Sequence, residues 1–461
     1  MTLIKSISGI RGTLGGNVGD TLTPIDIAKY AAAYGMWLKS SHGDNMTVVI
    51  GRDARPSGPM IAQLVANTLI SQGINVLDLG LSTTPTVEMA VMMEKAQGGI
   101  IITASHNPAG WNALKLLNDK GEFVSAADGK AILDWAESPE LAFVEPKKFG
   151  NISHNDDYIE KHIDEVLKHN LVDVAAVKEK KFKVILDAVN STGGISVPRL
   201  LEKMGVETTE LFCEPNGNFP HNPEPLPENI QQITSELKSG EFHLGIVVDP
   251  DVDRLVLVCE DGEPFGEEYT LVAVADYVLS QKKGNTVSNL SSTRALRDVT
   301  EKRGGEYFAA AVGEVNVVAT MKEVSAVIGG EGNGGVIVPE LHYGRDALAG
   351  IALFLTHLAK FGKSASMLRS TYPNYHISKN KIELTPDIDV DAILEALKQK
   401  YQKQPINTID GVKIEFDKEW VQLRKSNTEP IIRIFAESES AATAEHLANK
   451  IIADIKEFMS S

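Results

Sequence analysis

The stretch MTVVIGRDARPSGPMIAQLVANTLISQGINVLDLG, residues 46–80, decides the fold class of this chain. It opens with a short apolar run, continues with a helix-length amphipathic segment, and closes with a second apolar run. After another helical segment, a third apolar run begins in GGIIITAS at residues 98–105. Short apolar strands that alternate with amphipathic helices are typical of a mainly parallel sheet flanked by helices. We therefore predict an α/β fold.

The same alternation restarts twice farther along the chain. Strand-like runs ending in polar or glycine-rich loops occur in KFKVILDAVNSTGG (181–194), FHLGIVVDPDVDRLVLV (242–258), GNTVSNLSST (284–293) and VSAVIGGEGNGGVIVP (324–339). Beyond residue 371, long helical segments accompany strands in a pattern that favours an antiparallel sheet. We predict three related α/β domains with mixed sheets and a C-terminal α+β domain, at 1–150, 151–256, 257–371 and 372–461. The most linker-like stretch is Glu145–Asp157.

The composition is that of an ordinary globular protein, and its charge excludes some functions. With 62 acidic against 45 basic side chains the net charge is −17, which argues against non-specific nucleic-acid binding but not against anionic small molecules. No segment approaches the roughly 18–20 apolar residues of a membrane span, and the N-terminus lacks the apolar core of a secretion signal. The two cysteines, Cys213 and Cys259, lie in separate regions. We expect a cytoplasmic protein without a disulfide framework, a zinc cluster or a membrane partner.

Three aspartates follow the apolar run LGIVV at alternate positions: Asp249, Asp251 and Asp253. In an extended loop, side chains two residues apart project to the same side, so the three carboxylates could converge on one ion. Carboxylate oxygens suit Mg²⁺ or Ca²⁺. An EF-hand is excluded because Arg254 occupies the turn position that requires glycine, and because a strand-like segment follows. A solvated acidic turn remains the alternative.

Two glycine-rich segments have ambiguous roles. GEGNGG, residues 330–335, lacks the lysine and hydroxyl of a P-loop, but it offers Glu331 and Asn333 on flexible backbone. A carboxylate and an amide suit sugar hydroxyls, and a purely structural loop would have the same composition. In SISGIRG, residues 6–12, Arg11 is either a cation of the site or a surface arginine in a tight turn.

The loop RKSNTEP, residues 424–430, favours binding of a phosphate dianion. Short polar side chains, turn amides and an arginine together form a suitable phosphate receptor, although an ordinary turn has a similar composition. Arg433 follows shortly and adds charge or pairs with an acid. The candidate phosphate-binding side chains are Arg424, Ser426, Asn427, Thr428 and Arg433.

Ser105 in TASHNP ends a predicted buried strand. It is not in a G-x-S-x-G motif, so a hydrolase nucleophile elbow is unsupported. His106 is its immediate neighbour, which does not by itself supply the base geometry of a triad. Lys115 lies ten residues downstream and could supply positive charge or proton transfer. On these residues alone, Ser105 is a nucleophile, a phosphate anchor or a turn hydroxyl.

As an ordered set, TASHNP, DPDVDR, GEGNGG and RKSNTEP resemble the motifs of the α-D-phosphohexomutase superfamily over essentially the whole chain. The resemblance implies three related α/β domains and a fourth α+β domain around a central cleft. It also implies a phosphoserine at Ser105, which contacts a Mg²⁺ ion held by the three aspartates. The other implied roles are sugar binding by Glu331 and Asn333, binding of the distal phosphate by Arg424, Ser426, Asn427 and Thr428, and active-site cations at Arg11, Lys115 and Arg254.

The resemblance implies transfer of a phosphoryl group between O6 and O1 of a hexose phosphate through a hexose 1,6-bisphosphate, which also acts as activator. Glu314 in AVGEVN is similar to the VGD of phosphoglucosamine mutases. We therefore predict interconversion of glucosamine 6-phosphate and glucosamine 1-phosphate by a monomer or homodimer. The alternatives are a phosphomannomutase/phosphoglucomutase and a catalytically silent sugar-phosphate-binding protein.

Overall fold

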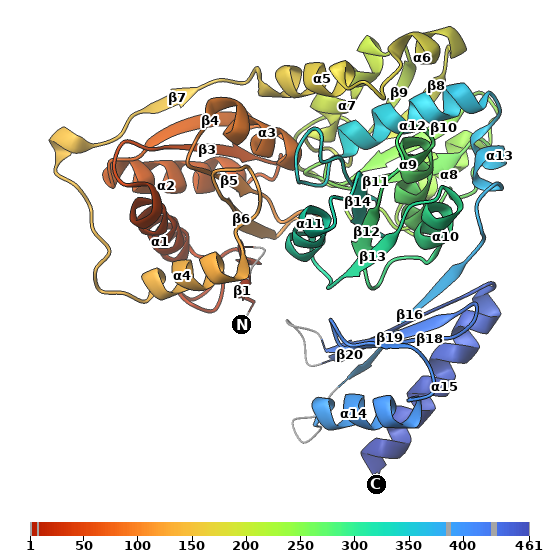
Figure 1. Cartoon of the computed structure of the whole chain (residues 1–461). Helices are drawn as coiled ribbons and strands as arrows, with labels where there is room; N and C mark the ends of the chain where they lie inside the picture. Colours follow the sequence, from red (N-terminus) through yellow and green to blue (C-terminus); the bar gives the residue numbers. More distant parts are fainter. Residues whose placement is uncertain (1, 7–8, 384–388, 426–430, 461) are drawn as a thin grey trace.

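The computed structural model describes residues 2–6, 9–383, 389–425 and 431–460, and these residues form four sheets with flanking helices (Figure 1). The first sheet lies apart from the second and third, which share a hydrophobic core. The fourth lies below the third in this view, at the C-terminal end of the chain. Within the described ranges, no helix is long and apolar enough to cross a membrane.

The first sheet has seven strands in the order β1-β2-β6-β5-β3-β4-β7. Helices α1, α2 and α4 contribute to the core on one face, whereas α3 packs on the other. The strands are β1 Ile4–Ser6, β2 Gly9–Thr13, β3 Thr47–Arg52, β4 Asn75–Leu81, β5 Gly98–Ile102, β6 Trp111–Leu117 and β7 Ile152–His154; the helices are α1 Pro24–His42, α2 Gly58–Ser71, α3 Thr84–Glu94 and α4 Ala126–Ala136.

The second and third sheets have four strands each, in the orders β11-β10-β8-β9 and β15-β14-β12-β13. The second contains β8 Lys183–Asp187, β9 Glu207–Leu211, β10 Leu244–Val248 and β11 Leu255–Cys259, with α5 Tyr158–Lys168, α6 Val174–Lys180, α7 Gly193–Lys203 and α8 Gln231–Leu237. The third contains β12 Thr286–Asn289, β13 Tyr307–Ala310, β14 Ile328–Glu331 and β15 Gly335–Ile337, with α9 Glu267–Gln281, α10 Ala295–Lys302, α11 Glu314–Glu323, α12 Ala347–Phe361 and α13 Ala365–Arg369.

The three sheets repeat one topology, which confirms the prediction of three related α/β domains with mixed sheets. In the first sheet the shared unit is β6-β5-β3-β4, and in all three units one outer strand is antiparallel to three parallel strands. The loop before the antiparallel strand carries, in turn, Ser105, the three aspartates and the GEGNGG segment. These three sequence motifs therefore occupy the same place in three copies of one unit.

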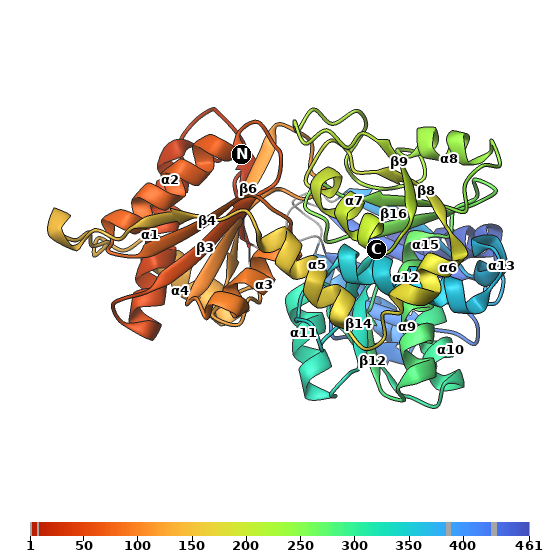
Figure 2. The same cartoon turned by 90° about the horizontal axis from the view of Figure 1, so that it is seen from above.

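The predicted domain boundaries at 150 and 256 do not coincide with the ends of the sheets. Position 256 lies inside β11, so the second sheet extends to Cys259. The linker-like stretch after residue 145 contributes β7, which pairs with β4 at the edge of the first sheet. Helix α5 then runs between the first sheet and the joint core of the second and third (Figure 2). β11 is one arm of a hairpin with β10, so the division at 256 cuts a single hairpin. The place of β7 depends on pairing with a strand more than 70 residues earlier, which local sequence patterns do not report.

The C-terminal region is an α+β domain, as predicted. Its five antiparallel strands have the order β16-β20-β19-β18-β17, and two helices cover one face. The elements are β16 His376–Glu383, α14 Val390–Lys400, β17 Ile406–Asn407, β18 Val412–Glu415, β19 Trp420–Lys425, β20 Ile431–Ser438 and α15 Ala441–Ser460. Polar groups link this domain to the third: Lys413 Nζ donates to the Leu290 carbonyl (2.8 Å), and Ser291 Oγ to Gln422 Oε1 (2.7 Å).

Candidate active site

A deep cleft between the domains contains most of the predicted site residues. It consists of two adjoining cavities of about 510 and 480 Å³ that share several lining residues. The first domain contributes Arg11, Ser105, His106 and Lys115; the second, Arg254; the third, Glu314, Glu331, Asn333 and Arg345; and the fourth, Lys379, Arg424 and Arg433.

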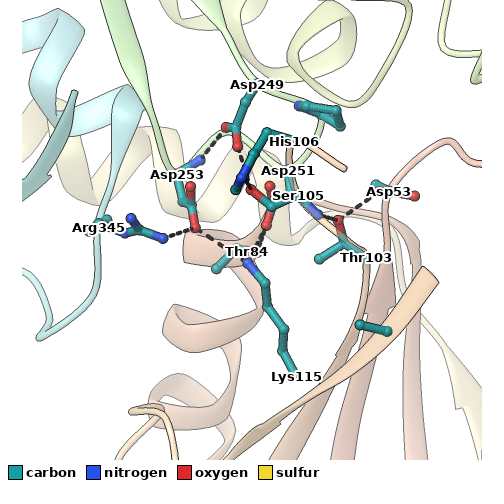
Figure 3. Close-up of polar contacts among 12 residues, drawn as sticks. Asp53, Thr84, Thr103, Ser105, His106, Lys115, Asp249, Asp251, Asp253 and Arg345 are labelled. Atoms are coloured by element: carbon teal, nitrogen blue, oxygen red, sulfur yellow. Dashed lines mark hydrogen bonds and ion pairs between the residues drawn. The ribbon is translucent and has the colours of Figure 1, made fainter. Parts of the chain in front are cut away.

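Ser105 lies at the buried end of the cleft, three residues after the end of β5, and its hydroxyl donates to Asp249 Oδ2 over 2.8 Å (Figure 3). Its Oγ also lies 3.2 Å from His106 Nδ1. The backbone of Ser105 is left-handed, with φ of 47°, which is strained for a residue with a side chain. Ser105 N–H donates to Thr103 Oγ1 (2.9 Å). The surrounding structure therefore holds the serine in a conformation that it would not adopt alone.

The three aspartates are fully buried, and one carboxylate oxygen from each lies within 4.8 Å of the others. They converge through a turn and not through the extended loop predicted from their spacing. Val252 is left-handed, with φ of 62°, and its N–H donates to the Asp249 carbonyl (3.1 Å). The turn also directs the N–H groups of Asp253 and Arg254 at Asp249 Oδ1.

This donor set fits a hard divalent cation. Among the described residues, Asp251 Oδ1 and Asp253 Oδ1 have no hydrogen-bond partner although both are buried. Burial and the charges of Asp253 and Asp251 raise the pKa of Asp249 well above its usual value. Buried carboxylates with unshared oxygens are stabilised by a cation, and oxygen ligands suit Mg²⁺. The three aspartates are therefore the residues that would hold this ion.

Lys115 on β6 approaches the same carboxylates. Its Nζ lies 2.7 Å from Asp251 Oδ2 and 3.3 Å from Asp253 Oδ2. Burial opposes the charge of Lys115, but the two carboxylates outweigh this effect and raise its pKa. The ammonium therefore keeps its proton at neutral pH, and the geometry favours a charge-stabilising role over the proton-accepting role considered from the sequence.

Arg345 is the most informative residue that the sequence analysis missed. Its guanidinium reaches Asp253 Oδ2 (2.7 Å), Glu331 Oε2 (2.7 Å) and Glu314 Oε2 (2.9 Å). It thereby joins the turn that contains the three aspartates to the GEGNGG segment. Burial raises the pKa of Glu314 to about 8, although Arg345 acts in the opposite direction. The sequence YGRDAL places this arginine two residues before the start of a buried helix. That position is the one local signal for Arg345, and it does not identify its partners.

Glu331 differs from its predicted setting. It ends β14, is almost fully buried, and also accepts from Asn289 Nδ2 (2.8 Å), so it is not on flexible backbone. Asn333 lines the cleft beside it, and its Oδ1 accepts from Gly335 N–H (3.2 Å). A second missed contact comes from α3, where Thr84 Oγ1 donates to Asp251 Oδ2 (2.5 Å).

The C-terminal domain brings two arginines to the far side of the cleft. Arg424 on β19 and Arg433 on β20 are paired in register, and both line the cavity with Lys379. Ser426, Asn427 and Thr428 lie outside the described residues. Arg11 on β2 and Arg254 line both cavities; burial and then the like charge of Arg254 lower the pKa of Arg11. Cations thus border both ends of the cleft.

Comparison with known proteins gives matches along almost the whole chain. Four models described as phosphoglucomutase/phosphomannomutase match: alpha/beta/alpha domain I at 4–142, domain II at 158–262, domain III at 266–375, and the C-terminal domain at 381–454.

Individual proteins match over similar lengths. A phosphoglucomutase/phosphomannomutase of Thermococcus kodakarensis is 34% identical, over 94% of this chain and 95% of its own. A probable phosphoglucosamine mutase of Methanopyrus kandleri is 31% identical over 96% of both. The crystal structure of a phosphoglucomutase/phosphomannomutase family protein from Burkholderia thailandensis superposes with a TM-score of 0.86, at 26% identity, over 99% of this chain and 98% of that one. The chain therefore belongs to the phosphoglucomutase/phosphomannomutase family and is a phosphohexomutase.

Proposed function

We propose that the chain moves a phosphoryl group between O6 and O1 of a hexose phosphate through phospho-Ser105 and a hexose 1,6-bisphosphate. The observation that carries the proposal is the hydrogen bond from Ser105 Oγ to Asp249, within the buried aspartate triad. A hydroxyl that only closed a turn would not need three carboxylates and a lysine around it. This setting also disfavours a catalytically silent sugar-phosphate-binding protein.

In the first half-reaction, the bond between phosphorus and Ser105 Oγ breaks, and phosphorus bonds to the free hydroxyl oxygen of the substrate. The substrate hydroxyl gives up one proton, and Ser105 Oγ takes one up. The product is the bisphosphate and a free Ser105 hydroxyl. After the bisphosphate has turned in the cleft, its other phosphoryl group returns to Ser105. Mg²⁺ held by the three aspartates would withdraw charge from the transferring group. The cationic side chains of Lys115, Arg11 and Arg254 stabilise the same charge.

The two ends of the cleft would bind the reacting and the non-reacting phosphate, respectively. Arg424 and Arg433 lie on the C-terminal domain, away from Ser105, and their charges suit the phosphate that is not reacting. Ser426, Asn427 and Thr428 are proposed to complete that receptor. Glu331 and Asn333 lie between the two ends and suit the sugar hydroxyls. Each end of the bisphosphate would occupy the distal receptor in turn, and closure over it would exclude water.

Glucosamine phosphate is the proposed substrate. The choice rests on Glu314, which lines the cleft and stands in AVGEVN, a segment similar to the VGD of phosphoglucosamine mutases. The name of the Methanopyrus relative agrees with this choice. Phosphomannomutase/phosphoglucomutase activity is the second candidate, because the Thermococcus relative has that name. Coupled assays with glucosamine, glucose and mannose 6-phosphates separate the two, and comparable turnover of all three would reject an amino-sugar preference.

The phosphoserine is tested by intact mass measurement after incubation with glucose 1,6-bisphosphate and Mg²⁺. The wild-type chain should gain one phosphoryl group, phosphatase should remove it, and Ser105→Ala should neither gain it nor turn over substrate. Ser153→Ala, on β7 at the edge of the first sheet, is the matched control and should behave as the wild type. An active Ser105→Ala variant would reject the mechanism.

A further inference from the structure

A buried arginine outside the cleft is bonded to the turn that contains Ser105. Arg55 lies between β3 and α2 and is fully buried. Its Nη2 donates to the carbonyls of Ser105 and Asn107, both at 2.6 Å. Its Nη1 donates to the carbonyls of Pro108 (2.7 Å) and Trp111 (3.1 Å). One planar group therefore binds four carbonyls of the seven-residue segment 105–111.

The Nε–H group of Arg55 begins a second chain of hydrogen bonds that leads to Ser105. Arg55 Nε donates to Asp53 Oδ2 (2.9 Å), and the same oxygen accepts from Thr103 Oγ1 (2.6 Å). Thr103 Oγ1 in turn accepts from Ser105 N–H (2.9 Å). All five N–H groups of the guanidinium are used, and both backbone polar groups of Ser105 are held by this set of contacts.

The same loop also contacts the second domain. The Ala54 N–H donates to Ser191 Oγ (3.3 Å), and Ser191 Oγ donates to the Pro250 carbonyl, between the first two aspartates (2.7 Å). The ring of Phe219 lies over the Arg55 guanidinium, with 4.9 Å from its carbon to the ring centre. Arg55 therefore lies where the serine turn and the aspartate turn are supported together.

We propose that Arg55 is a positioning residue for phosphoryl transfer: its fork of donors holds Ser105 in the left-handed conformation that directs Oγ at the aspartate triad. This inference rests on the proposed role of Ser105 as phosphoryl carrier. Lysine cannot replace Arg55, because a single ammonium has three donors and cannot span four carbonyls and a carboxylate. A small displacement of Oγ is enough to slow transfer, since a misplacement of about 1 Å can cost about 100-fold in rate.

The test compares Arg55→Lys with Gln72→Leu as the matched control. Gln72 is also fully buried in the first domain, and its Nε2 donates to the carbonyls of Ala32 (3.0 Å) and Ala142 (3.4 Å), away from the serine turn. Both variants lose buried hydrogen bonds to backbone carbonyls, and both should melt at a lower temperature than the wild type. The readouts, taken well below melting, are kcat, KM and the rate of Ser105 phosphorylation by glucose 1,6-bisphosphate.

We expect Arg55→Lys to lower kcat about 100-fold and to slow phosphorylation of Ser105 in parallel, with KM changed by less than about threefold. Gln72→Leu should keep the wild-type kcat. The proposal is overturned if Arg55→Lys retains wild-type kcat, or if both variants lose activity only in proportion to their unfolded fraction.

A second variant keeps the test decisive if Arg55→Lys does not fold. Thr103→Val preserves shape but removes the hydroxyl that receives the Ser105 N–H, and we expect about a tenfold loss in kcat with little change in KM, from a smaller displacement of the serine. Unchanged kcat in Thr103→Val would then reject the proposal. Failure of the proposed function has a different signature, because Ser105→Ala would remain active whatever Arg55 does.

Discussion

Two buried clusters in the described part of the chain meet the same geometric test for a metal site, and they differ in what surrounds them. In each cluster, three side chains of types that ligate metals have their ligand atoms within 4.8 Å of one another. The first is the aspartate triad at the cleft. The second consists of His162, His342 and Asp346, where α5 meets the loop before α12.

The difference lies in how the carboxylate oxygens are shared. In the first cluster, Asp251 Oδ1 and Asp253 Oδ1 have no hydrogen-bond partner among the described residues. In the second, Asp346 Oδ1 accepts from two N–H groups at the start of α12, and its Oδ2 accepts from His162 Nε2 (2.9 Å) and His342 Nε2 (3.3 Å). The comparison teaches that proximity of ligand atoms is insufficient, since a metal site also needs carboxylate oxygens whose lone pairs are not already shared.

Protonation provides the charge balance in the second cluster. Burial disfavours the imidazolium of His342, but its hydrogen bond with Asp346 and its ion pair with Glu88 (Nδ1 to Oε2, 3.2 Å) outweigh this effect and raise the pKa of His342 to about 10. His162 Nδ1 lies 3.0 Å from Thr86 Oγ1. We infer that this cluster is an ion-pair network that joins α3, α5 and the loop before α12. Thr84 of α3 and Arg345 of that loop contact the aspartate triad, so the second cluster supports the first.

The largest expected effect comes from the first cluster. Asp251→Asn keeps the size of the side chain but removes one charge, and we expect turnover to fall by about 1,000-fold and the response to Mg²⁺ to shift to much higher concentration. Initial rates measured across a Mg²⁺ titration provide the check. Asp261→Asn, an exposed aspartate just beyond β11, is the control. A wild-type Mg²⁺ response in Asp251→Asn would mean that the triad is only an acidic turn.

In the second cluster the expected effect is on stability. His342→Gln leaves Glu88 and Asp346 buried without their shared cation, which is expected to cost about 3–5 kcal/mol. Calorimetry should show a melting temperature lower by several degrees, and the exposed His154→Gln should melt as the wild type. A chelator should abolish activity while shifting melting less than His342→Gln does. If the chelator lowers the melting temperature of Asp251→Asn as much as His342→Gln does, the second cluster is a metal site.

The stability that His342 contributes should decrease as pH rises, because the pKa of this histidine is raised in the folded protein. With a folded pKa of about 10 against about 6.5 unfolded, protonated His342 contributes its full stability below about pH 6.5 and loses it as pH rises through 10. The groups facing it are Glu88 on α3, Asp346 on its own loop and His162 on α5. The melting difference between wild type and His342→Gln should therefore shrink between pH 7 and pH 10. A constant difference would contradict an imidazolium.

Local sequence patterns identified the parts of the fold and site that depend on local order. Apolar runs ending in polar loops predicted the strands, and TASHNP and DPDVDR each carry their side chains within a few residues. The shared strand order of the three sheets was not predictable, because pairing joins segments tens of residues apart. The turn at Val252 was missed because alternate spacing alone favours an extended loop.

Residues that act through distant partners were missed for the same reason. Arg345 lies 92 positions from Asp253, and Thr84 lies 167 from Asp251. Arg55 stands in GRDARPSG, where nothing local distinguishes a fully buried arginine from one on the surface. His342 and Asp346 lie near Arg345 in the sequence, but their partners Glu88 and His162 come from other elements.

The smallest expected effect comes from an ion pair across the same two domains. Lys322 on α11 contacts Glu122 after β6, so it links the third domain to the first as the second cluster does, but its side chain is 36% exposed. Solvent screens such a pair, and its contribution is below about 1 kcal/mol. Lys322→Ala should therefore shift the melting temperature by no more than a degree or two, and added salt should erase the shift. A loss as large as that of His342→Gln would mean that this contact, and not the buried network, holds the two domains together.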